Sequence, residues 1–310
     1  MHLGLPTIFL LLLSVVAGED VYASDPNIYE LTPSNFDKVV HKSNYTSIVK
    51  FYAPWCGYCK QLTPIYKKLG KFFHKDGQYA VNVVAVNCDK DYNKPLCSKH
   101  RVSGFPTLMV FRPPKYNQDK PKPQGVHAME TYSGERSFKS IMNFVNSRIK
   151  NYVKKFNNPS SDSLRQWISN PSTRSKVVLF TESNSIHNMY KSLAIDFLNS
   201  TEFSMVTVKD KDLFKQAVAN LNLSSITDFP MLFNVQEGEL VRFDRPKLDD
   251  KLAISKWLIE QNGHLPVEGQ LSKKDRYYSK YRGIKEKKPK EDRTEKPKKE
   301  AKKKTVHDEL

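Results

Sequence analysis

The rest of the chain is organised around one short stretch with two cysteines, Phe51-Tyr-Ala-Pro-Trp-Cys56-Gly-Tyr-Cys59-Lys60. The apolar run 47–52 leads into it and predicts a buried strand, and the pattern 61–73 that follows predicts a helix. Two thiols with two residues between them therefore lie where a strand passes into a helix, with Cys56 at the helix N-terminus. This arrangement indicates a redox site, because the helix dipole and unpaired backbone N–H groups favour a thiolate there.

The two cysteines are expected to have different roles in that site. Cys56 is the nucleophile that attacks a disulfide, since the thiolate is the reactive species. Cys59 lies one helical turn further along the same face, where it should be more buried. It is the resolving thiol, which attacks the mixed disulfide and releases the substrate. Gly57 and Tyr58 between them tune how strongly the thiolate is favoured.

The elements around the dicysteine follow the order β-α-β-α-β-α-β-β-α over residues 28–150, which is the order of a thioredoxin fold. Three segments resemble the catalytic domain of protein disulfide isomerases: Val49-Lys-Phe-Tyr-Ala-Pro-Trp-Cys-Gly-Tyr-Cys-Lys60, Val102-Ser-Gly-Phe-Pro-Thr-Leu108 and Tyr132-Ser-Gly-Glu-Arg136. The resemblance implies an enzyme that forms, reduces and rearranges disulfide bonds in proteins. The single dithiol and the total length look most like a small fungal member of that family with one catalytic domain.

The resemblance also implies roles for residues outside the dicysteine. Pro106 is expected to be cis and Phe105 to present its backbone beside the thiols, where an extended substrate segment can pair with it. Arg136 matches the family's mobile arginine, which swings towards Cys59 and lowers its pKa. A surface arginine without this role is the alternative.

Two positions depart from the family's pattern. Tyr58 stands where the family usually has a histidine that stabilises the thiolate, so we expect a less oxidising site. Lys50 stands where the family has a buried acid that is thought to relay a proton from the resolving cysteine. Either the Lys50 amine lies beneath the site, where burial would lower its pKa and let it accept a proton, or it points outward and the relay is missing. The sequence leaves both alternatives open.

Cys88 and Cys97 are the other two cysteines of the chain. The favoured interpretation, in an oxidising compartment, is a local structural disulfide. A zinc site formed with Cys56 and Cys59 is disfavoured, because the Trp-Cys-Gly-Tyr-Cys turn matches redox sites. A regulatory dithiol is the third interpretation. We expect the chain to bind no metal and to need no cofactor.

The same order of elements returns after residues 151–165, a segment rich in Asn, Ser and Lys that we interpret as a boundary. Asp228-Phe-Pro-Met-Leu-Phe233 resembles Gly104-Phe-Pro-Thr-Leu-Met109, which predicts an internal repeat about 125 residues long. No cysteine follows Cys97, so the second unit cannot perform thiol chemistry. Its aromatic residues are expected to form a core, and its surface to bind unfolded chains or a chaperone.

The sequence therefore predicts an α/β protein with two tandem thioredoxin-like domains. The predicted organisation is a signal peptide at 1–23, a catalytic thioredoxin domain at 24–150, a redox-inactive domain at 151–265 and a disordered basic tail at 266–310. The formal net charge is +17, and about half of it lies in the last forty residues. Because no nucleic-acid-binding motif accompanies this charge, a solvated tail is favoured over nucleic-acid binding.

Both ends of the chain predict residence in the endoplasmic reticulum lumen. The apolar run 3–18 is typical of a secretory signal, with cleavage after Ala17, Gly18 or Ala23; an uncleaved anchor is the alternative, and no membrane span is expected after cleavage. The last four residues, His307, Asp308, Glu309 and Leu310, form an HDEL retention signal. Three sequons, at Asn44, Asn199 and Asn222, predict glycosylation.

The expected partners follow from this location. They are unfolded or misoxidised secretory proteins, an endoplasmic reticulum thiol oxidase or glutathione, the HDEL receptor and a lectin chaperone. The alternative function is a redox-linked chaperone or adaptor that captures clients with little turnover, an interpretation that the substitutions at Lys50 and Tyr58 support.

Overall fold

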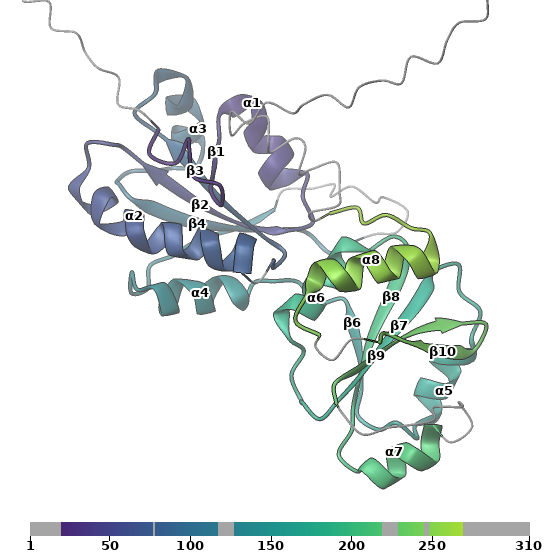
Figure 1. Ribbon diagram of the computed structural model, residues 1–310. Helices are drawn as coiled ribbons and strands as arrows, with labels where there is room; N and C mark the ends of the chain where they lie inside the picture. The colour runs from purple at the N-terminus through teal and green to yellow at the C-terminus, as the bar shows by residue number, and fades with distance from the viewer. Residues whose placement is uncertain (1–19, 77, 117–126, 219–228, 245–247, 269–310) are drawn as a thin grey trace, which may run out of the picture.

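A computed structural model describes residues 20–76, 78–116, 127–218, 229–244 and 248–268. These residues form two units, each built on its own five-stranded mixed sheet. The two units lie side by side, with the first drawn in purple to teal and the second in teal to yellow-green (Figure 1).

The first unit contains a sheet in the strand order β1-β3-β2-β4-β5. Its strands are β1 Tyr29–Glu30, β2 Thr46–Tyr52, β3 Val81–Asn87, β4 Thr107–Arg112 and β5 Ala128–Thr131. Its helices are α1 Pro33–Phe36, α2 Gly57–Gly70, α3 Lys94–Lys99 and α4 Phe138–Asn146; π-helical turns at Asp37–His41 and Lys71–Asp76 extend α1 and α2, and a 3₁₀ turn at Asp91–Asn93 precedes α3.

The central strands β2 and β3 are parallel and buried along their whole length. They are buried because helices cover both faces of the sheet, α2 and α4 on one side and α1 and α3 on the other (Figure 1). A strand that is covered on both faces needs a nearly continuous apolar run, and this explains the composition of Val81–Asn87. The dicysteine thus begins a helix that is anchored on a rigid sheet.

The second unit repeats this topology. Its strands, in the order β10-β9-β7-β8-β6, are β6 Val153–Phe156, β7 Ser175–Thr181, β8 Thr201–Thr207, β9 Met231–Gln236 and β10 Glu239–Arg242. Its helices are α5 Asp162–Ser169, α6 Asn188–Asp196, α7 Lys211–Val218 and α8 Lys251–Asn262. α6 and α8 pack on one face of the sheet, and α5 and α7 pack on the other. Two tandem sheets of thioredoxin-like topology are therefore present.

The interpretation of 151–165 as a boundary segment was wrong. This stretch contains β6 and the start of α5. In β6 the two ends, Val153 and Phe156, are buried, whereas the two lysines between them are exposed. The charged residues hid the strand in the sequence, because a four-residue edge strand offers too few positions for a periodic pattern.

A buried polar cluster joins the two units. The Lys251 ammonium of α8 lies 2.7 Å from the Asp196 carboxylate of α6, and both side chains are less than a tenth exposed. The Tyr45 hydroxyl of the first unit donates a hydrogen bond to the same carboxylate, at 2.5 Å. Lys251 also donates to the backbone carbonyl of Gln78, at 2.9 Å. Burial raises the pKa of Asp196 to about 6, against the opposing effect of Lys251.

Candidate active site

The two thiols of the dicysteine have different surroundings. Cys56 is the N-cap of α2, and its sulfur accepts a hydrogen bond from the backbone N–H of Cys59, at 3.3 Å. The Cys56 thiol also donates to the carbonyl oxygen of Phe105, at 3.5 Å. Cys56 is 8% exposed and Cys59 only 2%, so Cys56 is the thiol that a substrate reaches more readily. Both cysteines are free.

The electrostatics separate the two thiols further. Burial tends to raise the pKa of Cys56, but hydrogen bonds from the Cys59 thiol and from the backbone N–H groups of Cys59 and Tyr58 outweigh it and hold that pKa below its usual value. Burial raises the pKa of Cys59 to about 11, with a further upward contribution from Cys56. Cys56 therefore favours the thiolate and Cys59 the thiol, as an attacking and a resolving cysteine require.

The cis-proline loop lies directly beside the dicysteine. The Phe105–Pro106 peptide bond is cis, which is the geometry that the family resemblance implied. Arg136 lies at the same loop, where its guanidinium donates a hydrogen bond to the Pro106 carbonyl, at 3.2 Å. The structure thus brings the sequence-predicted residues 105, 106 and 136 to the edge of the dithiol site.

Comparison with known proteins identifies the family to which the chain belongs. Residues 27–147 match the thioredoxin family. Over 289 residues the chain is 38% identical to protein disulfide-isomerase MPD1 of Saccharomyces cerevisiae, a match that covers 86% of this chain and 88% of the yeast protein. The chain belongs to the protein disulfide isomerase family. As a member of that family it is an enzyme, a thiol–disulfide oxidoreductase with one dithiol of the Cys-x-x-Cys type.

Two other proteins are similar over most of the chain. A mitochondrial thioredoxin domain-containing protein of Schizosaccharomyces pombe is 36% identical over 237 residues, which are 73% of this chain and 58% of that protein. Among solved structures, full-length ERdj5 aligns with a TM-score of 0.44 at 17% identity and covers 78% of this chain and 33% of that chain.

The rim of the isomerase site is aromatic and exposed. Trp55 is 66% exposed and Tyr58 70% exposed. The Trp55 indole N–H donates to the Asp89 carboxylate, at 2.8 Å, and its ring packs edge-on against Phe105. These contacts hold the indole in place while leaving its surface open, so the rim offers an apolar surface next to Cys56.

Lys50 of the isomerase lies beneath the dithiol, and the outward orientation is excluded because this residue is fully buried. Its ammonium donates to the Tyr22 hydroxyl at 2.5 Å, to the carbonyl of Cys59 at 3.1 Å and to the Thr63 hydroxyl at 3.4 Å. Burial lowers the pKa of Lys50 to about 8, against the opposing effects of Cys59 and Glu30.

The position of Tyr22 bears on the predicted signal peptide, most of which falls on residues 1–19, outside the described part of the chain. Tyr22 is only 1% exposed and packs in the core cluster that contains the dicysteine. Cleavage after Ala23, and with it the boundary at 1–23, would remove this residue from the core. Cleavage after Ala17 or Gly18 fits the structure, because it leaves Tyr22 in place.

The other cysteine pair is a disulfide that joins Cys88, directly after β3, to Cys97 in α3. Since both sulfurs are engaged in this bond, they cannot serve as thiolate ligands of a zinc ion together with Cys56 and Cys59. The disulfide connects the end of a central strand to the helix that packs on the sheet, which supports the structural interpretation.

The asparagines of the three predicted glycosylation sites have different surroundings. Asn44 is only 7% exposed, and its backbone N–H is bonded to Glu268, so this fold leaves little space for a glycan at that position. Asn199 is exposed at the end of α6 and remains a candidate. Asn222 and the HDEL residues 307–310 lie outside the described residues.

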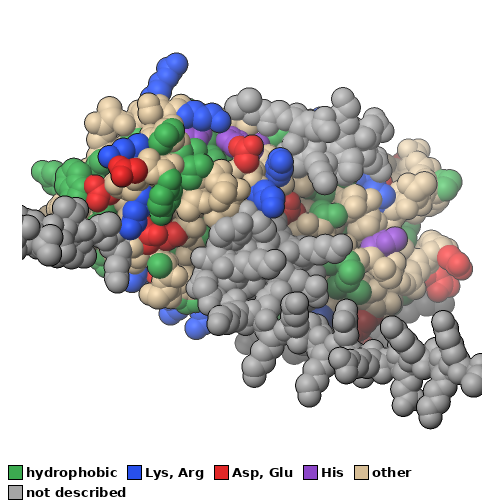
Figure 2. All heavy atoms as spheres, turned by 90° about the horizontal axis from the view of Figure 1, so that it is seen from above, with side chains coloured by type: hydrophobic (Ala, Val, Ile, Leu, Met, Phe, Trp, Pro, Cys, Tyr) green, Lys and Arg blue, Asp and Glu red, His purple; other side chains and the backbone are tan. Residues whose placement is uncertain are grey.

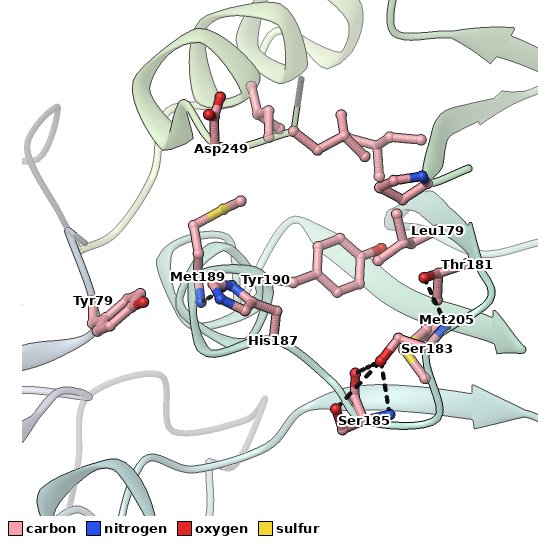
Figure 3. A pocket seen from close by; sticks show the side chains of 14 residues that line it. Tyr79, Leu179, Thr181, Ser183, Ser185, His187, Met189, Tyr190, Met205 and Asp249 are labelled. Carbon is pink, nitrogen blue, oxygen red and sulfur yellow. Dashed lines mark hydrogen bonds between the residues drawn. The ribbon is translucent and has the colours of Figure 1, made fainter. Parts of the chain in front are cut away.

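A cavity of about 500 Å³ lies where the sheet of the second unit ends, and Tyr79 of the first unit also lines it. Thr181 lines it from the end of β7, and Ser183, Ser185 and His187 line it from the segment that leads to α6. Ser183 and Ser185 hydrogen-bond to each other (Figure 3). Its other walls are mostly apolar and include Pro230, whose peptide bond with Phe229 is cis. This second cis-proline was not predicted, although the Phe-Pro of the first unit recurs in the sequence at 229–230.

The described residues on the face seen in Figure 2 form no continuous basic field. On the face seen in Figure 2, Lys and Arg side chains are interspersed with Asp and Glu side chains. None of the described helices is both long and apolar enough to cross a membrane. Within the same residues no group of His, Cys, Asp and Glu has the arrangement of a metal site.

Proposed function

We propose that this enzyme forms, reduces and rearranges disulfide bonds in proteins that fold in the lumen of the endoplasmic reticulum. The observation that carries the proposal is the unequal pair of thiols. Cys56 at the start of α2 has a lowered pKa, whereas Cys59, one turn further, is less exposed and has a raised pKa. The cis-proline loop and the exposed aromatic rim supply a surface on which an extended client segment can lie.

The chemistry follows from this asymmetry. The Cys56 thiolate attacks one sulfur of a client disulfide, forms a mixed disulfide and releases the other client sulfur as a thiolate. The client can then rearrange by attack of another of its own thiols. Alternatively, the Cys59 thiolate attacks Cys56, which closes the enzyme's disulfide and leaves the client reduced by two electrons. The reverse sequence oxidises a client dithiol and reduces the enzyme.

Refolding of a scrambled disulfide protein tests this proposal. The wild-type enzyme should restore the activity of the scrambled protein, and Cys56→Ser should lose this ability. Cys59→Ala should accumulate mixed disulfides that survive acid quenching and disappear on reduction. Equal refolding by wild type and Cys56→Ser would refute the enzymatic proposal.

A redox-linked chaperone or adaptor is the second candidate, because Lys50 and Tyr58 replace two residues that assist the family's usual site. This function predicts stoichiometric mixed disulfides but few turnovers by the wild type. Counting refolded molecules per enzyme at a large excess of client distinguishes the two functions. The proposed partners remain secretory clients, a thiol oxidase or glutathione, the HDEL receptor and a lectin chaperone.

The proposed location rests on the two ends of the sequence. A chain with its HDEL residues deleted should be secreted, whereas the intact chain should be retained and should co-fractionate with the endoplasmic reticulum. Secretion of the intact chain, or its recovery with mitochondria, would contradict this location.

A further inference from the structure

Three residues in one row of the first sheet place opposite charges beneath the dithiol. Ala85 of β3 is the register partner of both Glu30 in β1 and Lys50 in β2. Residues in register across adjacent strands point to the same face of a sheet, and this face carries α2 with the dicysteine. The small Ala85 side chain leaves open the space between the acid and the base.

Two tyrosines fill that space and link the charges. The Tyr22 hydroxyl accepts the hydrogen bond from Lys50, while the Tyr22 backbone N–H donates to the Glu30 carboxylate at 3.1 Å. The Tyr52 hydroxyl donates to the same carboxylate at 2.5 Å and accepts from the backbone N–H of Val21 at 2.9 Å. The lysine ammonium also faces the rings of Tyr22 and Tyr52. Lys50 is therefore hydrogen-bonded to the backbone carbonyl of Cys59 and to Tyr22, and the Tyr22 backbone connects it to the Glu30 carboxylate in an otherwise apolar core.

We infer that Lys50 is the proton acceptor of the resolving step at Cys59, and that Tyr22 is the residue that positions it. The carboxylate of this site is supplied by Glu30 of β1 instead of by position 50, so the polarity of the site is inverted. Glu30 itself is partly exposed to solvent. The inference rests on the proposed thiol–disulfide function and extends it to the proton.

The resolving step then balances as follows. The Cys59 thiol transfers its proton to the neutral Lys50 amine, which becomes an ammonium. The Cys59 thiolate attacks the Cys56 sulfur of the mixed disulfide, so that the Cys56–Cys59 bond forms and the bond to the client breaks. The electron pair leaves on the client sulfur as a thiolate. The ammonium then releases its proton to solvent, and the amine is ready for another cycle.

The charges around the amine agree with this assignment. The neutral amine is accessible near neutral pH because burial lowers the pKa of Lys50 to about 8. Burial raises the pKa of Glu30 to about 7, so its carboxylate is charged when the amine titrates. The titratable groups near Lys50 and Glu30 come from four elements: Asp20, Tyr22 and Asp25 of the N-terminal segment, Glu30 of β1, Tyr52 of β2, and Cys56, Cys59 and Tyr66 of α2.

The test follows the resolving step alone in the full chain. A mixed disulfide is prepared between Cys56 and fluorescently labelled glutathione, and the rate of glutathione release is measured by quenched flow from pH 6 to pH 10. For the wild type, this rate should rise with pH and level off above about pH 8, because the Lys50 amine, whose pKa is about 8, is neutral there. A rate that rises evenly through this range, with no bend, would overturn the inference.

Four variants separate proton transfer from structure. Lys50→Met should lose the bend and slow release at pH 7 by about 100-fold. Lys50→Arg should lose the bend as well, since a guanidinium keeps the charge but cannot deprotonate in this range. Tyr22→Phe, which keeps the ring, should slow release less than Lys50→Met. Lys67→Met removes an exposed lysine of α2 and should leave the profile unchanged.

Glu30→Gln supplies a readout that does not depend on how well a Lys50 variant folds. The carboxylate stabilises the Lys50 ammonium, so its removal should lower the pKa of the amine and move the bend to lower pH. An unmoved bend in Glu30→Gln, or a wild-type profile in Lys50→Arg, would overturn the inference. Failure to form any mixed disulfide at Cys56 would instead contradict the proposed function itself.

Discussion

The two units share a topology but differ where the chemistry occurs. Tyr52 ends β2 and Thr181 ends β7, and each accepts a backbone hydrogen bond of 2.8 Å from the residue that follows the neighbouring parallel strand. Four residues further along lie Cys56 in the first unit and Ser185 in the second. A serine hydroxyl cannot form a disulfide, so the same backbone carries a redox site in one unit and a polar cavity wall in the other.

The two units also differ in the residue that lies in the central strand beneath this loop. By register, Lys50 pairs with Ala85 and Leu108, and the corresponding residue of the second unit, Leu179, pairs with Met205 and Leu232. The first unit thus buries an amine and the second an apolar side chain at the same place. Both units keep a cis-proline facing this loop, at 106 and 230. The fold therefore supplies the platform, whereas the loop after the central strand and the residues below that loop supply the reactivity.

The largest expected effect follows directly from this comparison. Cys56→Ser should reduce disulfide rearrangement to the uncatalysed rate, because it removes the attacking thiolate. Ser185→Ala changes the corresponding position of the second unit and should leave the rate within about twofold of wild type, since surface substitutions usually have small effects. Refolding of a scrambled disulfide protein measures both. A large loss in Ser185→Ala would show that the second unit takes part in catalysis.

The contact between the units can be broken at Lys251. Lys251→Ala leaves the Asp196 carboxylate buried without its ion pair and should lower the free energy of unfolding by about 3–5 kcal/mol. Lys215→Ala removes one partner of an exposed ion pair in the same unit and should change it by less than about 1 kcal/mol. Urea titration followed by circular dichroism gives both values. Equal small effects would argue that the buried cluster around Lys251 does not stabilise the fold.

The disulfide belongs to the first unit alone, because the chain has no cysteine after Cys97. Replacing Cys88 and Cys97 together with alanine should destabilise the first unit by about 2–3 kcal/mol, the value expected for so short a closed loop. The second unit should keep its stability, which limited proteolysis with separate detection of the two units can follow. Loss of client turnover without loss of stability would favour the regulatory dithiol instead.

The smallest expected effect concerns Tyr58. Tyr58→His should make the dithiol more oxidising, by on the order of 30 mV, because a charged imidazole stabilises the Cys56 thiolate of the reduced form. Equilibration in glutathione buffers, with the thiols trapped and counted by mass, measures this potential. The exposed position of Tyr58 makes a folding defect in the variant unexpected. A potential equal to or below that of the wild type would contradict the role given to this position.

Much of the fold and of the dithiol could be predicted from the sequence, because the signals are local. A buried strand reads as an apolar run, and the thiol spacing at the start of a helix defines the asymmetry between Cys56 and Cys59. The Phe-Pro motif likewise placed Pro106 beside the thiols by resemblance. The short strand β6 could not be predicted, since two buried residues separated by two lysines carry no periodic pattern.

The charged and polar side chains that lie beneath the dithiol are brought together by the tertiary structure alone. Tyr22, Glu30 and Lys50 are separated in the chain and meet because β1 and β2 pair with the same strand, β3. Asp196 and Lys251 likewise meet Tyr45 only because the two units pack together. The sequence by itself determined the reactive pair and the elements that carry it. The partners of buried charges depend on strand register and packing, which no local pattern encodes.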